Sequence, residues 1–514
     1  MPCKKMAATT RPVECGVTHP YVFVYPLPRP YQQGVSRDHF PSLVPDDVAA
    51  AVTASDLVKS SHDLTTQLRS TTNWDTAGIF LHRMKTYSCA TTDPSDASRG
   101  RGLFWIPVIN EHPLVWERGG RRECVANPCN KSALTGLIST FRNGNGIPFI
   151  EAGQGVDHFY FTPRTGQHSD IRPYYDVDFR HQYFQNVQKI AVEDGAPYDW
   201  PGKFRTLRAF HSTPWPSYVH LEASAPLASA PWRRLHRPRQ FLVAYASSAS
   251  HHVGARPSRV VSSARDVMMQ MDAMRSVLQR ACSSAGSPRC VHMSLEQRDM
   301  KHLLNGKVVG NSNTLGWTER LPLSIVPQLG MLYSSAIFCL MPVGDTCTRK
   351  AIVDAMLLGC IPVLFHRCQR LQWPLHWGSW VKNATLFIDG KLLAARNQSR
   401  GSSANVPPYT PMSNKVPLDP IALLEAVPSS DVQQMQRTIA EHAHCMHYAV
   451  PTPRGSMNER GSLSEAADAF EITLIGAWFR SFKKSEIPHR AKAHQKRGGL
   501  PPQRTNLCAP LPTH

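Results

Sequence analysis

The chain has 514 residues, of which 42% are hydrophobic and 18% are charged. This composition excludes an intrinsically disordered protein, and the length allows two or three domains with cores of their own. The formal net charge of +19 favours polyanionic partners, which include nucleic acids, anionic lipids, acidic polysaccharides and nucleotide diphosphates.

Short apolar runs alternate with polar or helical stretches in the first half of the chain. Residues 1–20 are predicted to form a disordered leader, and residues 21–25 begin the first buried strand. Residues 223–239, rich in small residues, proline and arginine, are predicted to link two domains. The other elements expected in this half are strands at residues 103–109, 147–150, 158–161 and 204–210 and a helix at residues 130–141.

The alternation restarts after the linker. Residues 483–514 are basic and proline-rich, and we expect a disordered tail there. Strands alternating with helices on both sides of a linker predict two doubly wound α/β domains, at residues 21–230 and 238–482. The elements expected in the second half are strands at residues 241–245, 336–341, 360–365 and 384–388 and helices at residues 264–281, 325–333, 349–358, 419–446 and 464–482.

The 13 cysteines leave the redox environment open. Two close pairs lie in turn-rich stretches and have a spacing suited to disulfides: Cys124 with Cys129, and Cys282 with Cys290. The first residues lack the apolar segment of a signal peptide, and the most apolar run, residues 351–365, is too short to span a bilayer.

A zinc site is the alternative use of the other cysteines. Cys339, Cys347, Cys360 and Cys368 follow one another with His366 nearby, but they lack the close Cys-x-x-Cys spacing of zinc knuckles. Cys339 and Cys360 fall within apolar runs, where we expect them to pack as small hydrophobic side chains. We therefore predict no metal site.

The segment from Tyr333 to Leu364 carries the strongest functional signal. It is expected to form a strand, a glycine-containing turn, a helix and a second strand. Ligands of open α/β sheets bind beyond the carboxyl ends of the strands, which is where this turn lies. The free N–H groups and the dipole of the following helix favour a phosphate there. The alternative is a generic βαβ unit that binds no ligand.

Four residues at the start of that helix fit a nucleotide diphosphate. Thr348 opens the helix, and Arg349 and Lys350 can form charge-assisted hydrogen bonds with the phosphates. The Asp354 carboxylate is expected to accept hydrogen bonds from ribose hydroxyls. In the alternative, Thr348 only caps the helix and the two cations lie on the surface.

This segment resembles the signature of the exostosin family of glycosyltransferases, most closely its plant and algal branch. On this resemblance Ser335, Gly344 and Asp345 join the expected donor-binding residues. Weaker similarity extends from about residue 21 to residue 480, although Pro26 stands where the family often has aspartate. The matching residues of the signature lie in one register: Ser335, Phe338, Cys339, Leu340, Pro342, Gly344, Asp345, Arg349, Asp354, Ala355, Gly359, Cys360, Ile361, Pro362 and Val363.

The resemblance implies the GT-B architecture, in which two Rossmann-like domains face each other across a cleft. The C-terminal domain would hold a nucleotide (UDP-) sugar, and the N-terminal domain would hold a glycan or glycoprotein acceptor. It further implies an inverting enzyme of the Golgi that requires no metal or other cofactor. We also expect that the protein can form a homo- or hetero-oligomer. The basic charge favours an acidic glycan as the acceptor.

An inverting transfer needs a base that accepts the proton of the acceptor hydroxyl. We favour Asp157, with His158 beside it, and Glu151 is the second candidate. The alternative is that Asp157 caps a turn and His158 is a buried structural histidine.

Nucleic-acid binding is not expected, because no zinc finger, helix-turn-helix or aromatic RNA motif is present. An inactive exostosin-like or polyanion-binding protein is the alternative function.

Overall fold

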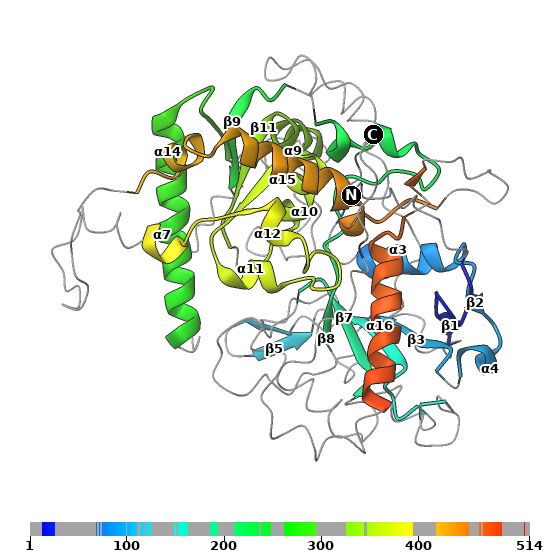
Figure 1. The fold of residues 1–514 in the computed structure, drawn as a ribbon. Coiled ribbons are helices and arrows are strands. Elements are labelled where there is room, and N and C mark those ends of the chain that lie inside the picture. The colour runs from blue at the N-terminus through cyan, green and yellow to red at the C-terminus, as the bar shows by residue number, and fades with distance from the viewer. Residues whose placement is uncertain are drawn as a thin grey trace, which may run out of the picture.

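The computed structural model contains two sheets of parallel strands with helices packed around them (Figure 1). The predicted leader up to residue 12, the helix expected at residues 130–141 and almost all of the predicted tail lie outside the described residues. The residues that the structure describes are 13–25, 68, 71, 75–98, 100–109, 115–118, 121–124, 149–150, 153–162, 186–193, 210–235, 238–247, 262–294, 325–343, 347–393, 418–451, 462–463, 466–485 and 508.

The first sheet has six strands in the order β2-β1-β3-β6-β7-β8. All of its pairs are parallel, so the carboxyl ends of the strands share one edge. Both faces of the central strands are buried, which explains their continuous apolar runs. The strands are β1 (Tyr21–Val24), β2 (Ala90–Thr91), β3 (Gly102–Ile109), β6 (His158–Thr162), β7 (Gln188–Ala191) and β8 (Phe210–Ser212). A separate antiparallel hairpin joins β4 (Val115–Arg118) to β5 (Arg121–Cys124).

The second sheet has five parallel strands in the order β10-β9-β11-β12-β13. In each sheet the strand that comes first in the chain lies between the next two, as β2-β1-β3 and as β10-β9-β11. The strand order therefore reverses there, as in doubly wound folds. The α/β prediction with two parallel sheets is confirmed, while the GT-B arrangement stays a prediction. The strands are β9 (Phe241–Ser247), β10 (Cys290–Ser294), β11 (Ala336–Met341), β12 (Ile361–Leu364) and β13 (Leu386–Phe387).

The helices of the second half contact this sheet and one another. The predicted helix at 419–446 is wrong as a single element, because Pro428 restricts the residue before it and α15 begins afresh there. In the first half, residues 149–150 form a turn where a strand was expected. The helices are α7 (Ser262–Ala285), α9 (Ile325–Ser334), α10 (Lys350–Leu357), α11 (Arg367–Leu371), α12 (Val381–Ala384), α14 (Pro420–Glu425) and α15 (Ser429–His442).

Gly359 ends α10 in a backbone conformation that favours glycine. Its φ is +76°, and a Cβ added there would lie 2.5 Å from Nη2 of Arg239. This guanidinium donates hydrogen bonds to the carbonyl oxygens of Leu358 (3.2 Å) and Gly359 (3.1 Å), and also to that of Ser334. The last arginine of the predicted linker therefore joins the carboxyl ends of α9 and α10.

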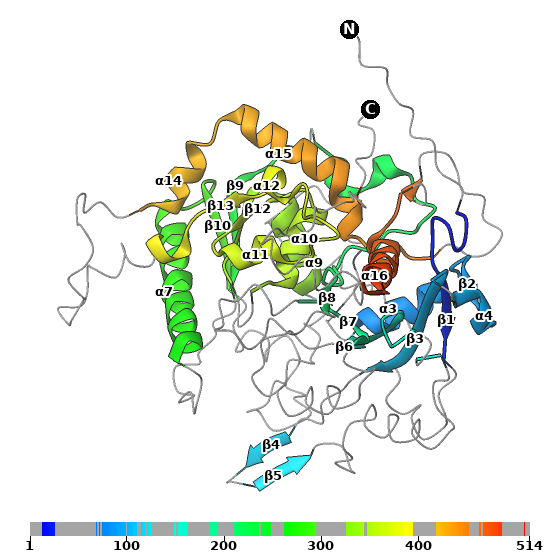
Figure 2. The same ribbon diagram turned by 60° about the horizontal axis from the view of Figure 1, so that its bottom comes forward.

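The last described helix, α16 (Ala469–Ser485), returns to the first sheet. Phe470, Leu474 and Trp478 pack with α3 (Asp75–Met84) in the core of that sheet, and both views show the two helices close together (Figures 1 and 2). The predicted second domain thus contributes its final helix to the first core. None of the helices in the described residues combines the length and apolarity needed to cross a bilayer.

The two chain segments that connect the sheets are hydrogen-bonded to each other. The Ala223 N–H donates to the Val450 carbonyl, and the Val450 N–H donates to the Leu221 carbonyl, both at 2.8 Å. The Leu221 N–H also donates to Nε2 of His447 (2.8 Å). The outgoing segment and the returning segment therefore lie side by side.

Five disulfides join the cysteines whose contacts the structure describes. The predicted pair Cys282–Cys290 is confirmed, whereas Cys124–Cys129 lies outside the described side chains. The remaining pairs are Cys15–Cys89, Cys339–Cys360, Cys347–Cys368 and Cys445–Cys508.

The disulfides correct one expectation from the sequence. Cys339 and Cys360 do not pack as separate thiols, because Cys339 lies on β11 and Cys360 directly precedes the adjacent parallel strand β12, with Cα atoms 6.0 Å apart, within disulfide reach. The zinc alternative loses its ligands as well, since all four of its cysteines are oxidised and no longer offer thiolates.

Three buried histidines should make the fold sensitive to acid. Burial lowers the pKa of His376 and His444 to about 3 each, and holds that of His447 well below 6.5. Because these folded-state values lie below the unfolded value, the unfolded chain binds more protons below pH 6.5. Stability is then lost as the pH falls from 6.5 toward 3, by up to about 1.4 kcal/mol per pH unit for each histidine.

His376→Gln should flatten the dependence of unfolding free energy on pH in this window. The measurement is urea unfolding of both proteins at several pH values below 6.5. Parallel curves for the two proteins would show that His376 does not contribute to acid unfolding.

Candidate functional site

The start of α10 lies against the carboxyl edge of the first sheet. The backbone N–H of Thr348 donates to Oε1 of Glu193, two residues after β7, at 2.9 Å. Nε1 of Trp215 donates to the Thr348 hydroxyl at 2.9 Å, and the Trp373 N–H donates to the Ser212 hydroxyl at 2.9 Å. In Figures 1 and 2, β7 and β8 are the strands of the first sheet nearest α10. The predicted phosphate turn thus meets the ligand-binding edges of both sheets.

Lys350 and Asp354 form an ion pair inside this junction. Nζ of Lys350 is 3.0 Å from Oδ1 of Asp354 and 2.8 Å from the centroid of the Tyr218 ring. The Asp354 carboxylate also accepts hydrogen bonds from the Ser217 hydroxyl and the Tyr218 N–H, each at 2.8 Å. Burial lowers the pKa of Lys350 to about 8, and the charge of Asp354 opposes this shift. Both side chains therefore join α10 to the segment that follows β8, and a ribose contact from Asp354 stays a prediction.

Arg349, Arg275 and Tyr245 gather beside the predicted turn. Arg349 precedes α10 in an extended conformation, and Arg275 of α7 donates to the Val343 carbonyl (3.4 Å) at the start of the turn. Burial raises the pKa of the Tyr245 hydroxyl, and the positive charges of Arg349 and Arg275 oppose that rise. Tyr245 belongs to β9, which lies between β10 and β11 where the strand order reverses. Two cations and a hydroxyl at this point suit an anionic ligand.

Sequence reasoning missed Arg275 and Tyr245. Arg275 lies in a helix that was predicted only from its apolar face, and nothing in that periodicity marks one arginine. Tyr245 ends a correctly predicted strand. Because β9 lies where the strand order reverses, its last residues are expected near a ligand. The strand order, however, is known only from the structure.

The remaining predicted donor-binding residues are not brought to this junction. Ser335 lies at the amino end of β11, where its hydroxyl donates to the Met331 carbonyl at 2.7 Å. The strand places it roughly 20 Å from the turn. Gly344 and Asp345 lie outside the described residues, as does the second candidate base, Glu151.

Asp157, His158 and Tyr25 form a chain of hydrogen bonds in the first sheet. Nδ1 of His158 is 2.7 Å from Oδ1 of Asp157, and Nε2 is 2.9 Å from the Tyr25 hydroxyl. The carboxylate selects the tautomer in which Nδ1 donates, so Nε2 accepts from Tyr25. His158 is fully buried and its ring stacks on Phe104 at 4.8 Å. Burial and then Asp157 raise the pKa of the Tyr25 hydroxyl.

Asp157 lies at the amino ends of the strands of the first sheet, and Glu193 lies at their carboxyl ends. Asp157 precedes β6 and Glu193 follows β7, and these strands are parallel neighbours with Phe159 opposite Gln188. The two carboxylates are therefore separated by roughly 20 Å along the strands. Glu193 is the one that contacts the predicted turn, although the sequence did not single it out, because β7 was not predicted. The Glu193-Asp-Gly195 sequence, a turn signal after an apolar run, was the available clue.

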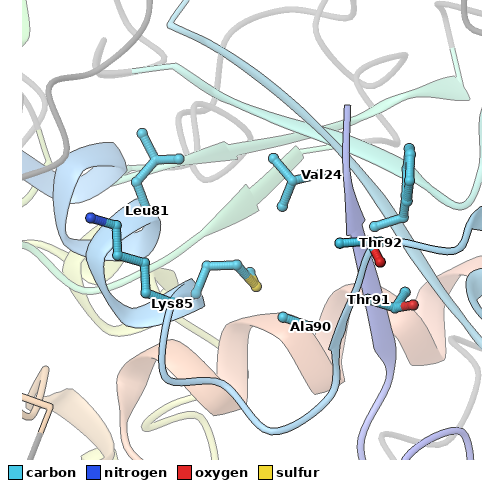
Figure 3. Close-up of a pocket in the computed structure, with 8 residues that line it drawn as sticks. Val24, Leu81, Lys85, Ala90, Thr91 and Thr92 are labelled. Atoms are coloured by element: carbon cyan, nitrogen blue, oxygen red, sulfur yellow. The ribbon is translucent and has the colours of Figure 1, made fainter. Parts of the chain in front are cut away.

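A cavity of about 510 Å³ lies at the far edge of the first sheet, between α3, β1 and β2. Figure 3 shows Leu81 and Lys85 of α3 on one side and Val24, Thr91 and Thr92 on the other. The described lining is mainly apolar with one charged side chain, and β2 is the edge strand opposite β8. This cavity is thus separate from the junction, and its lining does not suit a diphosphate.

Removing the Asp354 carboxylate should strongly destabilise the protein. Asp354→Ala leaves the Lys350 ammonium buried without its partner and takes an acceptor from Ser217 and Tyr218. We expect a loss of about 3–5 kcal/mol in the free energy of unfolding. Urea unfolding measures it, and Glu425→Ala, which breaks the exposed Arg289–Glu425 pair, is the control expected to change little. Equal losses in the two variants would contradict an internal role for Asp354.

Comparison with known proteins places these features in a wider group. Residues 17–380 match the model of the Exostosin GT47 domain. The chain is 22% identical over 364 residues to the probable xyloglucan galactosyltransferase GT12 of Arabidopsis thaliana, which covers 67% of this chain and 59% of that protein. It is 54% identical over 300 residues to the xyloglucan galactosyltransferase MUR3 of the same plant, covering 56% of this chain and 38% of that protein. The chain thus spans less than two thirds of the length of either relative.

Proposed function

Because the chain belongs to the exostosin GT47 family, we propose that it is a glycosyltransferase that moves a sugar from a nucleotide sugar to a polysaccharide. The observation that carries this proposal is the junction at Thr348, where the turn of the second sheet meets the carboxyl edge of the first. The names of the relatives suggest galactose as the first donor sugar to test and xyloglucan as the first acceptor.

Arg349 and Arg275 are the proposed ligands of the donor diphosphate. Bond cleavage at the anomeric carbon leaves negative charge on the diphosphate, which two guanidinium groups stabilise by charge-assisted hydrogen bonds. The first N–H groups of α10 add their dipole to this site. Lys350 stays a predicted phosphate ligand, and its ammonium is bound to Asp354 in the structure. That no metal is required stays part of the proposal.

On the acceptor side, an inverting transfer requires a base in the first domain. The proposal keeps Asp157, with His158 and Tyr25, as one candidate and Glu151 as the other. In the structure Asp157 orients His158 toward Tyr25, and it lies far from the turn. An Asp157→Asn enzyme with an unchanged transfer rate would remove Asp157 as the base.

Disulfide bonds support a location in an oxidising compartment. Ten cysteines of the described part of the chain are paired, and structural disulfides persist in secretory compartments but seldom in the cytosol. This agrees with the Golgi lumen that the family resemblance implies, and we include that location in the proposal.

The first test is a donor screen with purified protein. We expect one UDP-sugar, with UDP-galactose tried first, to bind and to release UDP when xyloglucan oligosaccharides are supplied. Arg349→Ala should weaken UDP binding by roughly ten-fold or more, because it removes a charge-assisted hydrogen bond. Calorimetry measures binding, and mass spectrometry measures the transfer product.

Arg289→Ala is the matched control, since Arg289 is paired with Glu425 on the surface of the second half. It should bind UDP as the wild type does. If no nucleotide sugar binds the folded wild-type protein, the transferase proposal fails. The alternative is then an inactive relative that binds polyanions, which the charge of +19 favours.

A further inference from the structure

A buried carboxylate from the first sheet contacts the turn to which the proposed function assigns the donor diphosphate. Glu193 has no exposed surface, and its Oε1 accepts the Thr348 N–H at 2.9 Å. Burying a charged carboxylate is unfavourable unless it is paired or hydrogen-bonded. The turn before α10 supplies such a bond, and the positive end of the helix dipole lies close by.

Neutral contacts also join the first half to this junction. Trp215 holds the Thr348 hydroxyl through its indole N–H, and Trp373 donates to Ser212 and to the Val192 carbonyl (2.8 Å). A glutamine at position 193 would also provide an oxygen acceptor. The negative charge of Glu193 is therefore not needed to accept the Thr348 N–H.

We propose that Glu193 is an internal competitor of the donor diphosphate. In the donor-free protein its carboxylate holds the Thr348 N–H, and a phosphate oxygen replaces it when the nucleotide sugar binds. One N–H forms one strong hydrogen bond, and two anions at the same donor repel each other. Return of the carboxylate then promotes release of the nucleoside diphosphate product. Glu193 is a positioning residue in this scheme, since it acts through the turn and not on the reacting atoms.

The inference rests on the proposed function, because it needs a diphosphate site at this turn. It predicts that removal of the Glu193 charge tightens UDP binding, whereas the loss of a structural contact would weaken it. Glu193→Gln keeps the oxygen that accepts the Thr348 N–H but removes the charge, so UDP should bind about three- to ten-fold more tightly and dissociate more slowly. Uridine, which lacks the phosphates, should bind the variant and the wild type equally.

The experiment compares UDP and uridine binding to wild type, Glu193→Gln and Glu222→Gln by calorimetry, and measures UDP dissociation by stopped flow. Glu222 is exposed and its substitution makes the same change in net charge, so this control should bind UDP as the wild type does. Glu193→Asp, whose shorter side chain withdraws the carboxylate from Thr348, should also bind UDP more tightly, and it serves if the glutamine variant does not fold.

Unchanged or weaker UDP binding by folded Glu193 variants would overturn the inference. So would an equal change in uridine binding, which would indicate a general rearrangement of the site. The proposed function fails separately, if the wild type does not bind UDP or if Arg349→Ala binds it as well as the wild type does. A protein that binds UDP through Arg349 but shows no tightening in the Glu193 variants would keep the function and lose only this inference.

Discussion

The contacts of Thr348 are the constraint on which the junction depends. Its N–H is bound by Glu193 and its hydroxyl by Trp215, so two residues of the first half hold one residue of the second. Next to it, Asp354 of α10 accepts hydrogen bonds from Ser217 and Tyr218. The start of α10 is thereby joined to the segment that follows β8 of the first sheet. These hydrogen bonds tie the turn to the first half of the chain. Donor binding at the proposed site would therefore act on the same hydrogen bonds that join the two halves.

The sequence predicted the strands whose residues are almost all apolar and failed where burial depends on tertiary contacts. The apolar runs of β9, β11 and β12 were identified close to their observed limits. In β7, two of the four buried residues are polar, and Gln188 is satisfied by the carbonyls of Val156 and Ala477, the latter on α16. No local pattern can show that a helix nearly 300 residues later supplies such a partner. Missing β7 also meant missing Glu193.

The cysteines show the same limit. Cys339 and Cys360 are separated by 21 residues, as are Cys347 and Cys368. The first pair joins β11 to the residue before β12, and the second joins the turn before α10 to α11. Spacing alone fits a metal site, isolated thiols or two disulfides, and only the register of β11 against β12 distinguishes them. By contrast, Thr348, Arg349 and Lys350 could be placed in advance, because the edge at which parallel strands bind ligands follows from chain direction. Their partners, which come from the other half of the chain, could not.

The hydrogen bonds between the two connecting segments limit how the halves can move. A single linker would allow bending and twisting in any direction. Here two of the described crossing segments are joined, because the Leu221–Ala223 segment is hydrogen-bonded to Val450 of the returning segment. Twisting would shear these bonds, whereas flexing about the line between the crossings preserves them. Any bending between the halves that keeps these hydrogen bonds must therefore turn about the line that joins the two crossings.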